Sequence, residues 1–475
     1  MDAKIFVQPK LSMLLLCLVF VMKYECAAQT TFNKMFSFGS YGRVGIGYSP
    51  SIQGNTSRQL NLLGQGSIGG RLEEQDYLEL LGALHFKPTT IHKDTTIINV
   101  QARAAFYNAG AQFIGNTSSK SINGLTVSLP ELYVEANNIM GSKWSVWVGA
   151  KFFRSNDIHI ADHFYFDDHS SQGFGVKWNR STFAMVFPSS VDTNASYPPY
   201  FYLNIVNGTP TLSLRQRTVA IGEQEFLLKN GGIIKLLGEY HRLADATPAE
   251  RNDSALNYPA DGGWVLGIKY NSTFKTKKEG SFNQLAVRYG HGIANGGDGG
   301  GSKTWLTYGA PDFATQKFGH AYSWALVEHF LLNLSNMFSL NGYALYTQSK
   351  GAAESMNKAP DYFGRPIFNR KTDFATGFRS FIYITNWFHL LNEASFALRK
   401  DGDQPAAEMF KFAIVPTFVP TAKRDPWARP HIRLVFSAAR YNEFAQENLY
   451  SPYLQQTGSK KWGIYFGVKS EWWLF

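Results

Sequence analysis

The chain has 475 residues, of which 15% are aromatic and 43 are glycine, and its net charge is +10. This composition is unusual for a soluble α/β enzyme. No basic cluster or nucleic-acid-binding motif accompanies the positive charge, so we expect no nucleic-acid partner and place the lysines and arginines in loops and in a polar interior. After residue 28 no apolar run approaches the length of a membrane helix. A chain of this kind can enter a membrane only as a closed β-barrel.

The first 28 residues are predicted to be a secretory signal peptide. Two lysines precede the apolar run Met13–Met22, and small residues follow at Cys26, Ala27 and Ala28, after which we expect cleavage. The run is shorter than the ~20 residues that a membrane helix needs, so a membrane anchor is the weaker alternative. Both cysteines, Cys17 and Cys26, lie in this segment. The remaining residues, 29–475, therefore contain no cysteine, and we interpret them as one domain.

Alternating residues predict β-strands along that domain. From Phe36 to Tyr48, apolar residues alternate with small, polar or aromatic ones, and the alternation returns in Trp462–Leu474. Membrane barrels carry this period in segments of about ten residues, with aromatic residues near the strand ends. The Trp-Trp pair near the terminus favours a barrel over a soluble sandwich. Similar segments are Tyr77–Phe86, Trp144–Phe153, Phe282–His291 and Ile432–Tyr441.

Loops rich in glycine, asparagine, aspartate and serine separate these segments. Clear examples are Asn295–Lys303, Gly351–Lys358 and Lys400–Ala407. Helical signals are few and short, and we expect any helix to lie in a loop. The string Gly64–Gly69 fits the dinucleotide fingerprint, but no parallel-strand run precedes it and no helix pattern follows. It is interpreted as a flexible turn before the second strand.

The acidic and histidine residues between positions 157 and 169 raise the question of a metal. The candidates are Asp157, His159, Asp162, Asp167, Asp168 and His169. A polar constriction loop fits them better, so we predict no metal and no cofactor, with calcium binding left as an alternative. Gly-x-Ser-x-Gly, His-Glu-x-x-His and Walker motifs are absent from the sequence, so there is no nucleophile or base to name and we predict no enzyme activity.

At this point the residues resemble a known family, the maltoporins or LamB-type carbohydrate porins. Four blocks occur in that family's order: Phe38–Gly47, Trp147–Phe153 continued by Asn156–Asp162 and Tyr165, Trp427–Arg433, and Phe466–Trp473. The resemblance implies an outer-membrane, transmembrane antiparallel β-barrel of about 18 strands with short periplasmic turns and long extracellular loops. It also implies a homotrimer, and one loop that folds inward to narrow the pore.

In that family a row of aromatic side chains, the greasy slide, runs down the lumen. The residues that match it are Tyr41, Tyr77, Phe282, Trp427 and Trp473. Strand alternation supports the match, because it puts each of the five in phase with polar residues, for example Tyr41 with Arg43 and Tyr77 with Glu79. Filling a narrow barrel, or lying in the interface girdle, is the alternative role for any single ring. Five rings in the lumen phase favour the slide.

Residues beside the slide are expected to form a polar track and constriction. Four of them are charged, namely Arg43, Arg71, Glu79 and Asp162, and the fifth, Phe164, contributes a ring at the constriction. A pyranose has a flat C–H face that packs on an aromatic plane and a rim of hydroxyls that donate and accept hydrogen bonds. Repeated shallow contacts of this kind suit transport, which needs both entry and release.

The sequence also departs from the family. A track arginine is replaced by Ser155, with Arg154 one position earlier on the opposite strand phase, and another falls on Glu131. Phe164 stands where the family has a tyrosine. The slide tryptophan that a neighbouring subunit supplies has only Phe113 as a candidate. The phase that turns Trp473 inward also turns the terminal Phe475 inward.

The leading hypothesis is passive diffusion of maltodextrin-like or other oligosaccharides through this channel in the outer membrane. A general porin for small hydrophilic solutes is the alternative, and it would conduct ions without being blocked by sugars. An outer-membrane barrel adhesin or hydrolase is the third. An adhesin would show no channel, and a barrel hydrolase needs a Ser/His pair at the lipid-facing rim that the sequence does not display.

Overall fold

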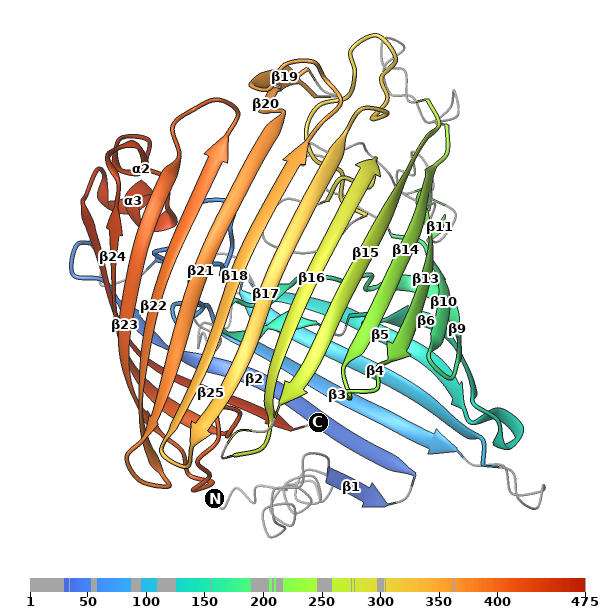
Figure 1. Cartoon of the computed structure of the whole chain (residues 1–475), viewed down its shortest axis with the longest axis horizontal. Helices are drawn as coiled ribbons and strands as arrows, with labels where there is room; N and C mark the ends of the chain where they lie inside the picture. The colour runs from blue at the N-terminus through green and yellow to red at the C-terminus, as the bar shows by residue number, and fades with distance from the viewer. Residues whose placement is uncertain are drawn as a thin grey trace, which may run out of the picture.

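The computed structural model describes residues 30–474, apart from residues 34, 53–57, 87–94, 109–124, 155, 189–204, 207–208, 211–216, 246–258, 275, 277, 297–302, 304 and 362–363. Within this described part, eighteen antiparallel strands form a closed barrel, which confirms the predicted all-β fold. In Figure 1 the strands from β15 to β23 run steeply across one side of the barrel, and those from β2 to β6 cross behind them at a different inclination. The predicted signal peptide lies outside the described residues.

The barrel strands follow one another around the wall in chain order. They are β2 (Phe36–Tyr48), β3 (Tyr77–Phe86), β4 (Ile97–Asn108), β5 (Leu125–Asn137), β6 (Trp144–Lys151), β9 (Ser171–Trp178), β10 (Ser181–Val186), β13 (Arg217–Leu227), β14 (Ile233–Leu243), β15 (Asp261–Phe274), β16 (Ser281–Gly292), β17 (Tyr322–Ser335), β18 (Phe338–Lys350), β21 (Arg370–Tyr383), β22 (Phe388–Asp401), β23 (Ala407–Phe418), β24 (His431–Tyr441) and β25 (Trp462–Leu474).

Short elements lie at the ends of the strands and in the connections. They are β1 (Thr30–Asn33), which pairs with β2, the 3-10 turns η2 (Ile139–Gly141) and η3 (His159–Ala161), the strand pairs β7 (Asp157–Ile158) with β8 (His163–Phe164), β11 (Ile205–Val206) with β12 (Thr209–Pro210) and β19 (Lys358–Pro360) with β20 (Pro366–Phe368), and the helices α2 (Glu443–Glu447) and α3 (Pro452–Thr457). Both helices lie in one connection, as the weak helical signals predicted.

The barrel closes where the first and last long strands meet. In the register of β2 with its two neighbours, Tyr41 is opposite Trp473 of β25 on one side and Glu79 of β3 on the other. Directly opposed residues of an antiparallel pair project from the same face of the sheet. Strand pairing alone therefore brings these three side chains together, although Tyr41 and Trp473 come from opposite ends of the chain.

Alternation along the strands separates an apolar outer face from a polar inner one. On the outside, Ile46 and Leu266 are 62% and 59% exposed, whereas inward-facing Arg379 and Glu393 are 1% and 6% exposed. Since the outer face meets hydrocarbon, apolar residues are stable there. In the described part of the chain, no helix is both long and apolar enough to span a bilayer.

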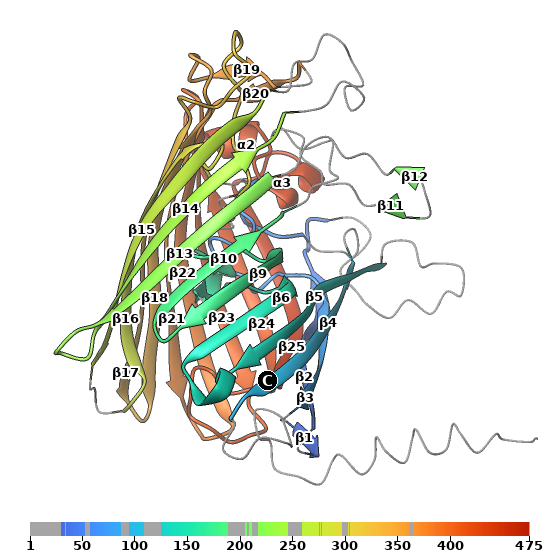
Figure 2. The same ribbon diagram turned by 90° about the vertical axis from the view of Figure 1, so that its right-hand side faces the viewer.

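Long connections gather at one end of the barrel, together with α2, α3, β19 and β20, and short turns close the other end (Figures 1 and 2). In outer-membrane barrels the short turns face the periplasm. Several predicted boundaries shift. β6 ends at Lys151, so the predicted segment Trp144–Phe153 overruns the strand, while β22 extends to Asp401 and β23 begins at Ala407, which shortens the predicted loop Lys400–Ala407.

The connection between β2 and β3 folds into the barrel. Leu60 and Leu62 are 0% and 2% exposed in the main hydrophobic cluster. The ammonium of Lys411, on β23, donates hydrogen bonds to Asn61 Oδ1 at 2.7 Å and to Glu73 Oε2 at 2.9 Å. We call this part, residues 58–76, the first inner loop.

The glycine-rich string of the first inner loop is a docking segment. Gly69 and Gly70 have φ angles of +94° and +118°, which side-chain-bearing residues rarely adopt. A Cβ atom on Gly70 would lie 2.2 Å from Glu393 Oε1, so the backbone approaches the wall closely. The glycines serve this approach of the loop to the wall.

A second inner loop, residues 152–170, crosses the lumen between β6 and β9. Its apolar residues Ile158 and Phe166 are fully buried. His169 Nε2 lies 2.8 Å from Glu239 Oε1 on β14, which anchors the end of the loop to the wall. The turn η3 in its middle places charged residues opposite β2 and β25.

Candidate functional site

The two inner loops and the strands on either side of the barrel closure enclose a cavity of about 610 Å³. We call it the constriction cavity. It is lined by Tyr41, Arg43, Arg71, Tyr77, Glu79, Arg103, Glu131, Phe152, Arg154, Asp157, His159, Asp162, Phe164 and Trp473. Every predicted site residue except Phe282 and Trp427 is in this lining.

Three tyrosines from successive strands form a row along one wall. The ring centroids of Tyr41 and Tyr77 are 5.9 Å apart, and those of Tyr77 and Tyr107 are 6.1 Å apart with nearly parallel planes. Tyr107, at the end of β4, was not predicted. Its alternation places it on the same face as Arg103, which is the signal that could have found it.

A second aromatic group begins on the other side of Tyr41, at its register partner Trp473. The centroids of Trp473 and Trp427 are 6.5 Å apart, and the His159 ring packs edge-on against both, at 5.3 and 5.9 Å. The guanidinium of Arg429 lies 4.2 Å from the centre of the Trp473 ring. Register and packing thus connect the two groups across the closure.

The strand-phase argument was wrong for Trp427. This residue lies in the connection between β23 and β24, not on a strand, so alternation does not determine its direction. It contacts Trp473 because the connection folds back toward the end of β25. Its backbone N–H donates to Asp425 Oδ1 at 2.7 Å.

Phe282 faces the interior but lies apart from the cavity. Its ring packs edge-on against His329 of β17, with centroids 5.1 Å apart. His329 in turn lies 6.5 Å from Tyr165 of the second inner loop. Of the five predicted slide residues, four either line the constriction cavity or, like Trp427, pack against a ring that lines it. Phe282 does neither.

Arginines and carboxylates hold the first inner loop against Tyr41. Arg71 Nη2 donates to the Tyr41 hydroxyl at 2.7 Å, and that hydroxyl donates to Glu471 Oε1 at 3.1 Å. Arg71 and Arg43 both pair with Glu74 Oε2, at 2.9 and 3.2 Å. The Tyr41 ring is thus fixed in orientation by charge-assisted hydrogen bonds.

Asp162 of the second inner loop remains ionised in this setting. Burial alone would raise the pKa of its carboxyl, but the guanidinium groups of Arg71 and Arg43 lower that pKa overall. Its backbone is in the left-handed region, with φ of +45°. This turn presents the charge of Asp162 to the two arginines.

Arg103 supplies a cation that the sequence comparison did not predict. It lies on β4 directly opposite Glu131 of β5 and binds both Glu131, at 2.6 Å, and Glu79. Arg103 thus places a positive charge in the wall of the constriction cavity, between two carboxylates.

Arg154 forms the opposite side of the cavity. Its guanidinium is sandwiched between Phe152 and Phe164, 4.1 and 4.0 Å from the two ring centres. The prediction that it points the wrong way assumed a continuing strand, but β6 has already ended at Lys151. The ring of Phe164 stacks on the arginine.

The residues considered as metal ligands have other roles in the structure. Asp157, His159 and Asp162 line the constriction cavity, and His169 anchors the loop to Glu239. Among the described residues, no three histidine, cysteine, aspartate or glutamate side chains are arranged to hold a metal ion.

The described part of the chain thus combines a closed barrel, two inner loops and a cavity lined by aromatic rings. The model of the LamB porin family matches residues 36–473, almost the whole barrel. The chain belongs to the LamB porin family. This LamB porin is an outer-membrane β-barrel, and the membership implies a carbohydrate-selective channel and not an enzyme.

Solved porin structures also resemble this LamB porin, at low identity. Acinetobacter baumannii OccAB1 is 10% identical with a TM-score of 0.43, covering 95% of this chain and 100% of that one. Salmonella typhi OmpF, in complex with daunomycin, is 8% identical with a TM-score of 0.43, covering 94% and 100%. Pseudomonas aeruginosa OccD3 is 10% identical with a TM-score of 0.42, covering 94% and 93%. The assignment rests on the family match and not on these likenesses.

Besides the predicted signal peptide, three residues discussed for this LamB porin lie outside the described residues. They are Phe113, Ser155 and Phe475. The predictions attached to them are left as predictions.

Proposed function

We propose that this LamB porin lets linear, maltodextrin-like oligosaccharides diffuse passively across the outer membrane, with the sugar rings moving along the aromatic side chains of the lumen. The observation that carries the proposal is the row of Tyr77, Tyr41 and Trp473 in the lining of the constriction cavity, beside ion-paired arginines. An apolar plane beside fixed donors and acceptors matches the two faces of a pyranose.

The charged groups around the row are already paired with one another. Arg103 with its two glutamates, and Arg71 with Glu74, present hydrogen-bonding atoms without a bare charge. A sugar hydroxyl can exchange hydrogen bonds with such groups at little cost, since the ion pairs persist when it leaves. Contacts of this kind are shallow and repeated, as conduction requires.

The proposal is tested by sugar block of ion current through the purified porin in a planar bilayer. Maltotriose and longer maltodextrins should reduce the current in a saturable manner. Replacing Tyr41 or Trp427 by alanine should raise the half-blocking concentration about fivefold, equivalent to ~1 kcal/mol of aromatic contact, without closing the pore. Current that no oligosaccharide blocks would contradict the proposal and leave the general porin.

Two control variants separate the ring from its surroundings. Tyr41→Phe keeps the aromatic plane but loses the hydroxyl contacts with Arg71 and Glu471, so it should retain most of the block. Tyr48→Ala removes a tyrosine from the same strand on the outer face, where the side chain is 43% exposed, and should leave the block unchanged.

We also propose that the chain is exported by its first 28 residues and assembles as a homotrimer. Cleavage after Ala28 would give a mature protein that begins at Gln29. Mass spectrometry of protein purified from outer membranes should find that N-terminus, and light scattering in detergent should give three times the chain mass. A monomer that shows full sugar block would contradict the trimer.

A further inference from the structure

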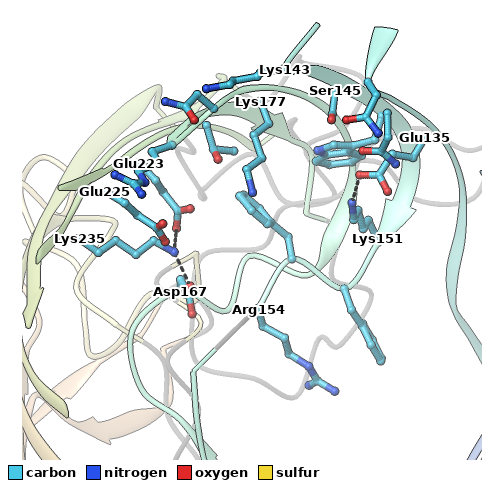
Figure 3. A pocket seen from close by; sticks show the side chains of 18 residues that line it. Glu135, Lys143, Ser145, Lys151, Arg154, Asp167, Lys177, Glu223, Glu225 and Lys235 are labelled. Carbon is cyan, nitrogen blue, oxygen red and sulfur yellow. Dashed lines mark hydrogen bonds and ion pairs between the residues drawn. The ribbon is translucent and has the colours of Figure 1, made fainter. Parts of the chain in front are cut away.

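A second pocket lies next to the constriction cavity, against the strands β5, β6, β9, β10, β13 and β14. Its volume is about 560 Å³, within the ~300–1,000 Å³ range of small-molecule sites. The turn residues Asn138, Lys143 and Asn179 border it, so it opens toward the end with the short turns. We call it the turn-side pocket (Figure 3).

The two cavities adjoin at Arg154. Phe152 and Arg154 line both of them, so a solute that passes the constriction meets the turn-side pocket on the far side of the stacked guanidinium. In Figure 3 Arg154 lies at the edge of the pocket opposite Lys143. The pocket thus lies on the route from the constriction to the periplasmic turns.

Lysines pair with three of the four carboxylates that line the described part of the turn-side pocket. Lys235 lies 3.0 Å from both Asp167 Oδ2 and Glu223 Oε1. Lys151 Nζ lies 2.6 Å from Glu135 Oε1. These two clusters occupy opposite sides of the pocket in Figure 3, with the Lys177 side chain extending between them. Glu225 is the only lining carboxylate of the described residues without such a partner.

Several cations of the pocket have no carboxylate partner among the described residues. Lys143, Lys177 and Arg180 make no side-chain hydrogen bond or ion pair there, and Arg154 is held only by its two aromatic neighbours. The described lining therefore holds six basic side chains against four carboxylates, an excess of positive charge. A concave site with like charges concentrates anions.

The rest of the lining is suited to a sugar. Trp147 and Phe153 provide aromatic surface, with centroids 6.1 Å apart. Amide and hydroxyl groups surround them at Asn137, Ser145 and Thr182. Aromatic planes, neutral hydrogen-bonding groups and free cations together match a saccharide that carries an anionic substituent better than they match a simple inorganic anion.

We propose that the turn-side pocket is a second binding site that receives the carboxylates of acidic oligosaccharides, such as short oligouronates, after they pass the constriction. This inference rests on the proposed function and extends its substrate class from neutral to acidic chains. Lys177 and Arg180 bind the carboxylate, while the aromatic lining packs against the ring.

The test compares current block by maltotriose and by a linear triuronate of equal length, using the wild-type porin in a planar bilayer. At low salt the triuronate should block at a concentration about fivefold lower, which corresponds to ~1 kcal/mol. The advantage should shrink as the ionic strength rises, because salt screens the partly exposed cations. A sulfated trisaccharide in a third arm should show the same preference if charge alone decides it.

A double variant, Lys177→Gln with Arg180→Gln, should remove the preference for the triuronate and change maltotriose block by less than twofold. Lys229→Gln is the matched control, since Lys229 is an exposed lysine in the neighbouring turn that does not line the pocket. Heat-modified mobility on gels verifies that each variant is a folded barrel.

The outcomes separate this inference from the proposed function. If neither sugar blocks the wild-type channel, the proposed function fails and the pocket proposal fails with it. If maltotriose blocks and the triuronate blocks no better at any salt concentration, the pocket proposal is overturned while the proposed function stands. A triuronate preference that survives in the double variant also overturns the assignment to this pocket.

Discussion

The docking of the first inner loop depends on one buried lysine. Lys411 is 1% exposed, and its ammonium contacts Asn61, the carbonyl of Gly70 and the carboxylate of Glu73, which is itself 1% exposed. Lys411→Met preserves the length and apolar volume of the side chain but leaves the charge of Glu73 buried, with Ser437 as its one remaining side-chain donor among the described residues.

The expected cost is large because one partner of a buried pair is removed. Such a loss destabilises the arrangement by ~3–5 kcal/mol, which raises the undocked population by a factor on the order of a hundred or more. The undocked loop would carry Arg71 and Glu74 out of the constriction. We therefore expect a higher single-channel conductance, more current noise and weaker block by maltodextrins.

Single-channel recording in planar bilayers measures this effect directly. The matched variant combines Lys411→Met with Glu73→Gln, which removes the unpaired charge, and it should recover much of the wild-type conductance and block. A Lys411→Met channel whose conductance and half-blocking concentration equal those of the wild type would show that docking of the first inner loop does not depend on Lys411.

Three other contacts, at Gly70, Arg103 and His169, also shape the lumen. Gly70→Ala should destabilise the loop by more than ~1 kcal/mol, since it forces a Cβ against Glu393 at a positive φ, and thermal melting of the folded porin should detect a lower midpoint or a separate early transition. Arg103→Gln leaves two glutamates unpaired at the constriction, so reversal potentials in a salt gradient should shift toward cation selectivity; an unchanged potential would argue against their ionisation. Burial alone would lower the pKa of the His169 imidazole, but the carboxylate of Glu239 raises that pKa overall. The ion pair between the two side chains therefore stabilises the docked loop fully below pH ~6.5. This stabilisation is lost as the pH rises through the raised pKa of His169. Current noise from the second inner loop should therefore increase toward alkaline pH, and His169→Gln should abolish that dependence.

Much of the barrel could be predicted from the sequence because strand alternation is a local property. The segment Tyr77–Phe86 coincides with β3, and the inward direction of Tyr41, Tyr77 and Trp473 follows from their phase with charged neighbours. The same rule failed where the chain leaves the wall. Phe152 and Arg154 lie just beyond the end of β6, and Trp427 lies in the turn between β23 and β24. Side chains outside a strand do not alternate between two faces, so alternation does not predict their direction.

Two further residues of the constriction needed information that no single segment contains. His159 was grouped with possible metal ligands because of its acidic neighbours, yet it packs between Trp427 and Trp473, which are more than 260 positions away in the sequence. Arg103 has ordinary strand surroundings, and only the pairing of β4 with β5 places it against Glu131 in the wall of the cavity.

Strand alternation is enough to predict which side of each strand faces lipid and which faces the lumen, because hydrophobic burial acts residue by residue along a regular backbone. The closeness of the inner loops to the wall and the charges that meet in the lumen follow from the three-dimensional fold alone. Those properties depend on two loops folding inward and on the closure of the first strand against the last, and such long-range contacts are set by packing between residues that are far apart in the chain.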